Sequence, residues 1–226
     1  MFNRKKYKKY ALVQLKKRWK IPVIASIIYI LACVIFNIPE FYNEINGFSN
    51  FETETAEIIS NLCLLLELCI LYITLYAQVN LHLKMSRSPQ KVTFNDYLEG
   101  FSYFSRAVVC GLWETLFTFL WSLLFIIPGI IKHYSYCMTK YIALEYPQVS
   151  VFKAIKISME ITRGHKMEIF VMELSFIGWF ILSAITMGIG LCWVMPYYLM
   201  TYTNAYHALL TEAVESKRLK PEDFQD

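Results

Sequence analysis

The sequence has 226 residues, of which 56% are hydrophobic, 16% are aromatic and 18% are charged, with a formal net charge of +4. Soluble globular domains contain about 45–50% apolar residues, so this composition argues against an ordinary soluble domain and indicates a chain that places apolar surface in lipid. Nine of the 22 Lys and Arg residues lie within the first twenty positions. A basic run beside a membrane span is poor evidence for nucleic-acid binding, and we expect no nucleic-acid partner.

The chain opens with this basic segment, which we expect to form an amphipathic helix over residues 1–19 at the inner membrane surface. Lys and Arg beside a span attract anionic lipid, at about 1 kcal/mol per residue near the surface. The alternative is that these charges only fix the orientation of the chain. The basic residues expected to face lipid are Lys5, Lys6, Lys8, Lys9, Lys16, Lys17 and Arg18.

Apolar stretches then recur along the chain. A membrane-spanning helix needs about 20 mostly apolar residues, and six stretches qualify: 20–38, 57–80, 105–127, 129–146, 167–187 and 190–212. The first could also be read as a secretory signal, but further apolar stretches follow it, so we expect a retained span. The fourth and sixth are polar for spans, and a four-span protein is the alternative. We predict an all-α fold, a polytopic membrane helix bundle of about six spans.

The predicted spans pair into three hairpins, and each hairpin follows a basic amphipathic helix. Thr93 and Ser150 are of residue types that cap helix N-termini. Shifted by 58 residues, Phe94 falls on Phe152, and the order of elements repeats. We expect a single integral-membrane domain over residues 1–226. Its parts are the helix 1–19, hairpin 20–80 with an acidic outer loop, helix and hairpin 92–146, helix and hairpin 150–212, and a cytoplasmic tail 213–226.

The distribution of charge predicts the orientation of these hairpins. Twenty of the 22 Lys and Arg residues fall in segments 4–20, 84–106, 153–166 and 217–220, whereas segment 37–56 holds none and contains four Glu residues. An excess of Lys and Arg in cytoplasmic loops is the positive-inside pattern. We therefore expect the N- and C-termini of this multi-pass protein to be cytoplasmic.

The stretch LWSLLFIIPGIIKHYSY, residues 120–136, places Pro128, Gly129 and the basic Lys132 directly after an apolar run. We expect Pro128 and Gly129 to make the turn between the third and fourth spans, with Lys132 extending toward the outer surface. The segment MGIGLCWVMP, 187–196, would separate the fifth and sixth spans. The residues expected to make turns and close packing are Pro128, Gly129, Gly178, Trp179, Gly188, Gly190 and Pro196.

Five ionisable residues fall within the predicted spans: Glu67, Glu114, Lys140, Glu173 and His207. Such groups cost about 2.5–3.5 kcal/mol on insertion scales and usually face the bundle interior. Their depth predicts that Glu114 pairs with Lys140 and that Glu173 pairs with His207, whereas Glu67 has no obvious partner. These residues indicate either a polar path for a proton, ion or solute, or interhelical pairs that hold the bundle together.

Motifs of known chemistry are lacking. The sequence has no Gly-rich phosphate loop, no His-Glu-x-x-His, no Gly-x-Ser-x-Gly and no Cys-x-x-Cys. An intramembrane enzyme built on Glu67 or Glu173 would lack a recognisable nucleophile. We therefore expect no catalytic residues, no metal and no cofactor, and we interpret the six cysteines as small apolar fillers.

The segments LWSLLFIIPGIIKHYSYCMTKYIALEYP and GHKMEIFVMELSFIGWFILSAITMGIGLCWVMPYYLMTYTNAYHALL, with the basic opening around Trp19, resemble a bacterial integral-membrane family catalogued as domain of unknown function 975. The resemblance covers most of the chain and is strongest over 120–210, although His165 stands where the family pattern has Asn. It implies a multi-pass protein of a bacterial plasma (inner) membrane. It implies no activity, because the family is uncharacterised. The residues that match are Trp121, Pro128, Gly129, Lys132, Tyr136, Gly164, Lys166, Phe170, Phe176, Gly178, Trp179, Gly188, Gly190, Pro196, Tyr197 and Tyr206.

Two functions follow from the residues. The first is a non-enzymatic membrane component that organises lipid or a partner complex through its basic helices, with the bilayer and its anionic headgroups as partners. A membrane-protein partner or a second copy of the chain would also fit. The second is a small transporter or channel subunit with a polar intramembrane path. Because the sequence shows no substrate site, it favours the first.

Overall fold

Helices make up all the regular structure of the described part of the chain, which confirms the all-α prediction. The computed structural model describes residues 2–46 and 54–225, with side chains described outside 36–60. The predicted acidic outer loop, with Glu40, Glu44, Glu52 and Glu54, lies outside the described side chains. The helices are α1 Arg4–Leu15, α2 Lys20–Asn46, α3 Glu54–Arg87, α4 Phe94–Leu98, η1 Glu99–Tyr103, α5 Phe104–Leu124, α6 Ile126–Tyr136, α7 Thr139–Glu145, α8 Val151–Ile161, α9 Lys166–Leu174, α10 Ile177–Ile185, α11 Leu191–Glu215 and η2 Pro221–Phe224.

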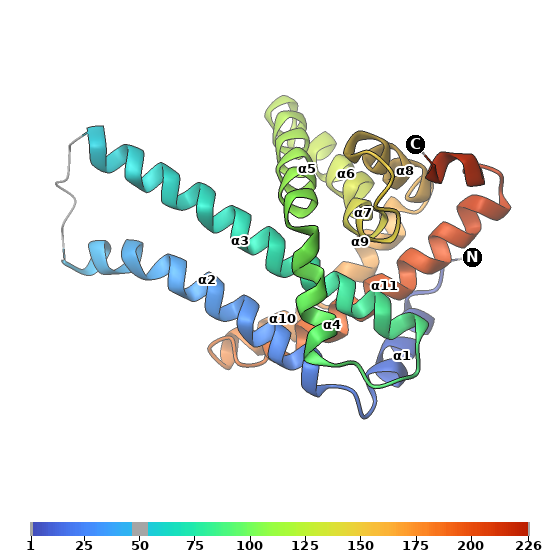
Figure 1. Cartoon of the computed structure of the whole chain (residues 1–226), viewed down its shortest axis with the longest axis horizontal. Coiled ribbons are helices and arrows are strands. Elements are labelled where there is room, and N and C mark those ends of the chain that lie inside the picture. The colour runs from blue at the N-terminus through green and yellow to red at the C-terminus, as the bar shows by residue number, and fades with distance from the viewer. Residues whose placement is uncertain (1, 47–53, 226) are drawn as a thin grey trace.

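Pairs of helices extend from a common centre (Figure 1). The longest arm consists of α2 and α3, and a second arm consists of α5 and α6. At the centre, residues of α7, α8 and α11 form a buried core that includes Tyr141, Ile142, Ile157 and Tyr206. Both chain ends lie on the side away from the free end of the α2–α3 arm.

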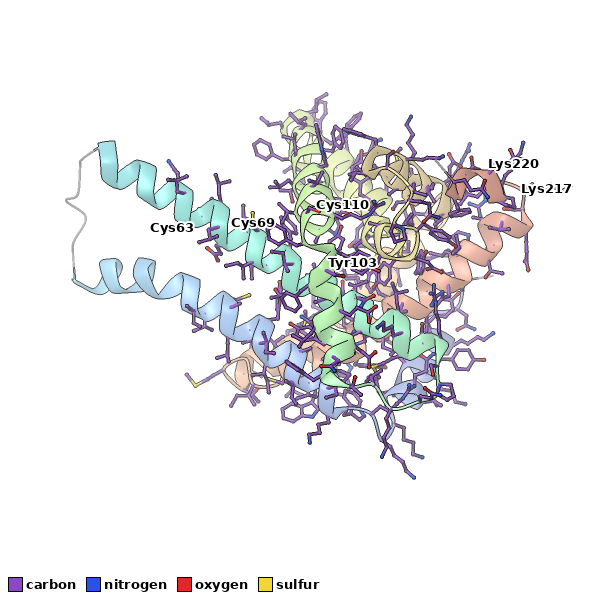
Figure 2. The ribbon with its side chains drawn as sticks, in the orientation of Figure 1. Cys63, Cys69, Tyr103, Cys110, Lys217 and Lys220 are labelled. Atoms are coloured by element: carbon purple, nitrogen blue, oxygen red, sulfur yellow. The ribbon has the colours of Figure 1, made fainter. Side chains whose placement is uncertain are left out.

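The outer parts of the arms expose apolar side chains. Leu65 of α3, Phe119 of α5 and Ile185 of α10 are exposed, as are their apolar neighbours. Figure 2 shows Cys63 and Cys69 along the α3 arm and Cys110 closer to the centre on α5. Apolar surface of this kind suits a lipid environment better than water.

Three continuous helical segments of the described residues are long and apolar enough to span a membrane: Asn61–Arg87, Phe94–Leu124 and Lys166–Ile185. A fourth is added if Arg4–Leu15 and Lys20–Ile35, which meet at 105°, are counted as one broken span. The predicted six spans are therefore not confirmed. The predicted fourth span is divided between α6 and α7, and eleven residues of α11 are buried, so much of their apolar surface faces protein.

The basic N-terminal segment forms helix α1 as predicted. Asn3 caps the helix, since its side chain accepts a hydrogen bond of 3.1 Å from the backbone N–H of Lys6. Tyr7, Ala11 and Leu15 recur every four residues on one face and are buried, and α1 packs against α11. The apolar face of this helix therefore contacts protein, where the sequence predicted contact with the membrane surface.

The predicted caps Thr93 and Ser150 begin α4 and α8. Helix α8 packs into the core with Ala154, Ile157 and Ile161 buried, whereas Phe152 is exposed and its ring lies 4.9 Å from that of Trp113. The buried face of α8 thus contacts neighbouring helices.

The turn between α5 and α6 lies at Phe125, which has extended backbone angles, and not at Pro128 and Gly129 as predicted. Pro128 occupies the first turn of α6, where backbone N–H groups have no intrahelical acceptor, so proline is tolerated there. Gly129 is buried, and a Cβ atom on it would lie 2.9 Å from Cα of Ser122. Glycine therefore allows α6 to approach α5 closely.

A glycine also allows close helix packing at the link between α10 and α11. A Cβ atom on Gly190 would lie 2.6 Å from Oγ of Ser183. The spacing of seven residues between Ser183 and Gly190 is the same as that between Ser122 and Gly129. In the same link Gly188 has φ +86°, a backbone conformation that favours glycine. By contrast, no atom lies within 4 Å of a Cβ placed on Gly178, so its predicted packing role is not supported.

Candidate functional site

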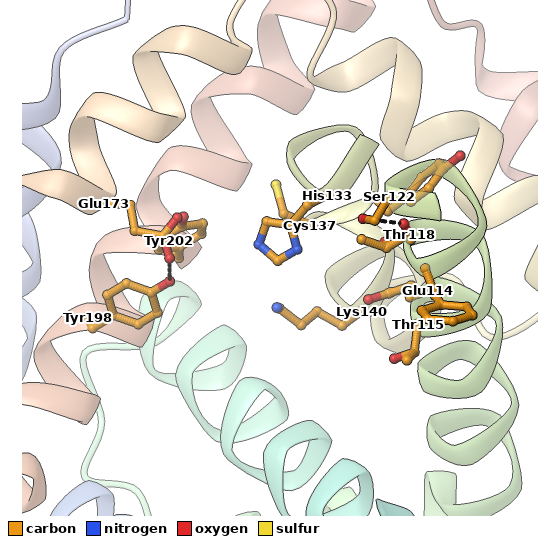
Figure 3. A pocket seen from close by; sticks show the side chains of 12 residues that line it. Glu114, Thr115, Thr118, Ser122, His133, Cys137, Lys140, Glu173, Tyr198 and Tyr202 are labelled. Atoms are coloured by element: carbon orange, nitrogen blue, oxygen red, sulfur yellow. Dashed lines mark hydrogen bonds between the residues drawn. The ribbon is translucent and has the colours of Figure 1, made fainter. Parts of the chain in front are cut away.

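A polar cavity of about 460 Å³ lies between α5, α6, α7, α9 and α11 (Figure 3). It brings together three of the five ionisable residues predicted to lie in spans, Glu114, Lys140 and Glu173. Ligand-binding cavities in proteins have volumes of about 300–1,000 Å³. The other polar residues of the lining are Thr115, Thr118, Ser122, His133, Tyr136, Tyr198 and Tyr202.

The charged groups of the cavity come from opposite sides. Glu114 belongs to α5, whereas Glu173 belongs to α9. The side chains of Lys140 and His133 extend into the space between these two walls (Figure 3). A solute in this space would meet carboxylate, ammonium and imidazole groups at once.

Glu173 is held by two tyrosines. The hydroxyl of Tyr134 donates a hydrogen bond of 2.6 Å to its Oε2, and the hydroxyl of Tyr198 donates one of 2.8 Å to its Oε1. The predicted partner His207 lies nine residues beyond Tyr198 on α11, a distance of about 13.5 Å along a helix. His207 Nε2 is instead 2.8 Å from Oγ of Ser86, so the predicted Glu173–His207 pair is wrong.

Glu114 faces the cavity without the predicted ion pair. None of the ion pairs within the described residues joins it to Lys140, although both residues line the cavity. Its Oε1 atom is buried and has no hydrogen-bond partner in the described part of the chain. This oxygen has almost no accessible surface, and the side chain of Thr139 lies close to the carboxylate, so the part of Glu114 that lines the cavity is the remainder of its side chain.

Glu67 is separate from this site. It lies in the outer half of α3 and is not among the residues that line the cavity. A polar path that connects all the predicted intramembrane charges is therefore not observed in the described residues.

The predicted lipid-facing basic residues separate into two groups. Lys5, Lys6, Lys9, Lys16 and Lys17 are exposed. Lys8 donates a hydrogen bond of 2.9 Å to the carbonyl of Ser175 and lies 3.9 Å from the ring centre of Phe176. Arg18 donates to several backbone carbonyls, among them that of Ser88 at 2.7 Å. Lys8 and Arg18 thus contact the protein itself.

Lys132 lies over the ring of Trp121, with 4.6 Å between the ammonium nitrogen and the ring centre. This is a cation–π contact, and it explains how a lysine is accommodated beside the apolar end of α5. Trp179 is half exposed, and its ring meets that of Tyr197 edge-on at 6.5 Å. Pro196 is buried inside α11.

Sequence reasoning missed the tyrosines of the site. Tyr198 and Tyr202 line the cavity, and together with Tyr206 they recur every four residues along α11, a spacing that places them on one helix face. This pattern could have been found, but tyrosines were counted among the apolar residues of a span. His133 was likewise not among the predicted site residues, although it lines the cavity.

Residues 123–213 match a family model described as "Protein of unknown function (DUF975)". The match confirms the resemblance over this region, which includes His133, Lys140, Glu173 and Tyr198 but not Glu114. No curated protein and no solved structure matches the chain.

Proposed function

We propose that this chain, whose residues 123–213 match the family model described as DUF975, is a non-enzymatic multi-pass membrane protein that binds a small polar solute. The solute would occupy the cavity between α5, α6, α7, α9 and α11, as in a small transporter or channel subunit. The observation that supports this proposal is a cavity lined by Glu114, Lys140 and His133, in which no ion pair of the described residues joins Glu114 to Lys140.

The chemistry of the cavity indicates the kind of solute. Both oxygens of Glu173 already accept hydrogen bonds from tyrosines, so this carboxylate serves to position α6 and α11. Glu114 and Lys140 are the groups left to contact a ligand. A solute with an ammonium group for Glu114 and a hydroxyl or carboxylate for Lys140 would satisfy both.

The membrane setting supports a functional role for these charges. Glu114 and Glu173 belong to helical segments that are long and apolar enough to span a membrane. Ionisable groups in such segments are costly, and they mark substrate or ion pathways more often than surface residues do.

The proposed topology places both termini in the cytoplasm of a bacterium, with the basic segments on the cytoplasmic side of the plasma membrane. In this arrangement α2 pairs with α3, α5 pairs with α6 and α7, and α9 and α10 pair with α11. These three hairpins would restore the six crossings suggested by the sequence.

A second role, organising anionic lipid or a partner complex, is supported by the exposed lysines of α1. Lys5, Lys6 and Lys9 are exposed, while the opposite face of the helix packs on α11. If this role is correct, replacing these three lysines by glutamine will weaken recruitment of anionic vesicles to protein in neutral nanodiscs. The loss should be large at low salt and small at high salt. Equal recruitment by both proteins at low salt would contradict it.

The solute-binding proposal is tested with putrescine, ethanolamine and glycine as probes. We expect at least one of them to raise the thermal stability of the purified protein in a saturable manner and to cross liposomes that contain it. Glu114→Gln should abolish both effects. Glu67→Gln provides a matched control, because it neutralises a glutamate of α3 outside the cavity and should behave as wild type. Absence of any effect with all three probes, or equal loss in both variants, would overturn the proposal.

A further inference from the structure

A second cavity, of about 530 Å³, lies between two segments that are far apart in the sequence. One segment, 13–18, includes the last residues of α1 and the bend after it, and the other, 85–91, includes the last residues of α3 and those that follow. We call this cavity the basic cleft. It shares no lining residue with the polar cavity described above.

Every charged residue of its lining is a cation. The lining includes Lys16, Lys17, Arg18, Arg87 and Lys91, together with Ser86 and Ser88, and it contains no Asp or Glu. Arg87 is ion-paired with Glu145, so its charge is offset. Lys16, Lys17 and Lys91 are exposed, and no ion pair of the described residues involves them.

Arg18 joins the two segments that form the basic cleft. Its guanidinium donates to the carbonyls of Ser88 at 2.7 Å and Gln90 at 3.1 Å, which fastens the segment after α3 to the bend after α1. A further hydrogen bond of 2.8 Å joins its Nε to the carbonyl of Gln14. All these acceptors are neutral, so the positive charge of Arg18 adds to that of the neighbouring lysines.

In the membrane placement proposed above, the cleft lies at the membrane surface. Helix α2 begins at Lys20, and the apolar segment Asn61–Arg87 of α3 ends at the cleft. Trp19, a residue type enriched where membrane meets water, directly follows Arg18 in the sequence. Lipid phosphates occupy this level of a bilayer.

We propose that the basic cleft binds a phosphate group, carried either by an anionic lipid headgroup or by a soluble phosphate compound. Lys16, Lys17 and Lys91 contact the phosphate, and Arg18 holds the two segments at the correct separation. A cluster of several Lys and Arg residues immediately beside a span is typical of sites for anionic lipid. This inference rests on the membrane placement proposed above, but it is independent of solute binding in the polar cavity.

The test uses the full-length protein in detergent with fluorescent dioctanoyl phosphatidic acid as the probe. We expect saturable binding that weakens at least tenfold in the double variant Lys16→Gln/Lys91→Gln. The matched control, Lys217→Gln/Lys220→Gln, removes the same charge from exposed lysines near the C-terminus (Figure 2) and should bind within twofold of wild type. Equal weakening in both double variants, or no saturable binding by wild type, would overturn the proposal.

A competition experiment identifies the source of the phosphate. Competition by inorganic phosphate at millimolar concentration would support a soluble phosphate, whereas saturable lipid binding without such competition would support a lipid headgroup.

Two further controls test the specificity of binding and its independence from the polar cavity. Fluorescent dioctanoyl phosphatidylcholine should not bind saturably, and equal affinity for both lipids would contradict recognition of an anionic phosphate. Glu114→Gln should leave phosphatidic acid binding unchanged, so a failure of either proposal is visible independently of the other.

Discussion

The hydroxyl of Tyr198 donates a hydrogen bond of 2.8 Å to Oε1 of Glu173 and so joins α11 to α9 at the wall of the polar cavity. Tyr134 of α6 donates to the other oxygen of the same carboxylate. One acidic side chain thus connects three helices. Hydrogen bonds to charged groups contribute about 1.5–3 kcal/mol each.

We expect Tyr198→Phe to lower the free energy of unfolding by about 1–3 kcal/mol, because it removes one hydrogen bond to a partly buried carboxylate. Thermal unfolding of the purified protein, followed by circular dichroism, measures the change. Tyr10→Phe is the control, since Tyr10 is exposed on α1. Equal stability of the Tyr198 variant and wild type would show that this hydrogen bond does not stabilise the packing of α11 against α9.

We expect Gly129→Ala to destabilise the protein by about 1–3 kcal/mol, the usual cost of overpacking. The added methyl group would lie 2.9 Å from Cα of Ser122 and would force α6 away from α5. Gly178→Ala, where nothing lies within 4 Å of the new atom, should be neutral or slightly stabilising because alanine favours a helix. A similar loss in both variants, measured by thermal unfolding, would contradict the close approach at Gly129.

His165 predicts a dependence of stability on pH. It lies between Glu168 and Glu212, with its Nε2 2.7 Å from Oε1 of Glu212, which Arg218 also contacts. Burial lowers the pKa of His165, but its hydrogen bonds to the two carboxylates raise it more, so the net shift is upward.

A folded-state pKa above the unfolded value of about 6.5 means that the contribution of His165 is fully present below that pH. It is lost as pH rises through the folded-state pKa. We therefore expect the difference in melting temperature between wild type and His165→Gln to shrink between about pH 6 and pH 9. A difference that stays constant or grows over this range would contradict the charged interaction.

The sequence predicted the helical class, the caps at Thr93 and Ser150, and three ionisable residues of the cavity. It did so because helix-capping chemistry is local and because buried charges stand out in apolar segments. The number of membrane spans could not be predicted reliably from the sequence, because composition does not distinguish an apolar residue that faces lipid from one that faces protein. Tyr141 and Ile142 of α7, for example, have no exposed surface.

Partners across helices were harder to predict than the helices themselves. The Glu173–His207 pair was derived from matched depth in an ideal hairpin, but tyrosine hydroxyls from α6 and α11 satisfy that carboxylate. The turn at Phe125 was missed because proline is accepted in the first turn of a helix as readily as in a turn.

The most direct test of the account is labelling of single cysteines in a cysteine-free background with a membrane-impermeant maleimide on intact cells. Position 130, which is exposed on α6 shortly after the turn at Phe125, should react from outside. Position 90, in the basic segment after α3, should react only after the membrane is opened. Reaction at position 90 in intact cells, with position 130 protected, would contradict the proposed orientation and the membrane setting of both cavities.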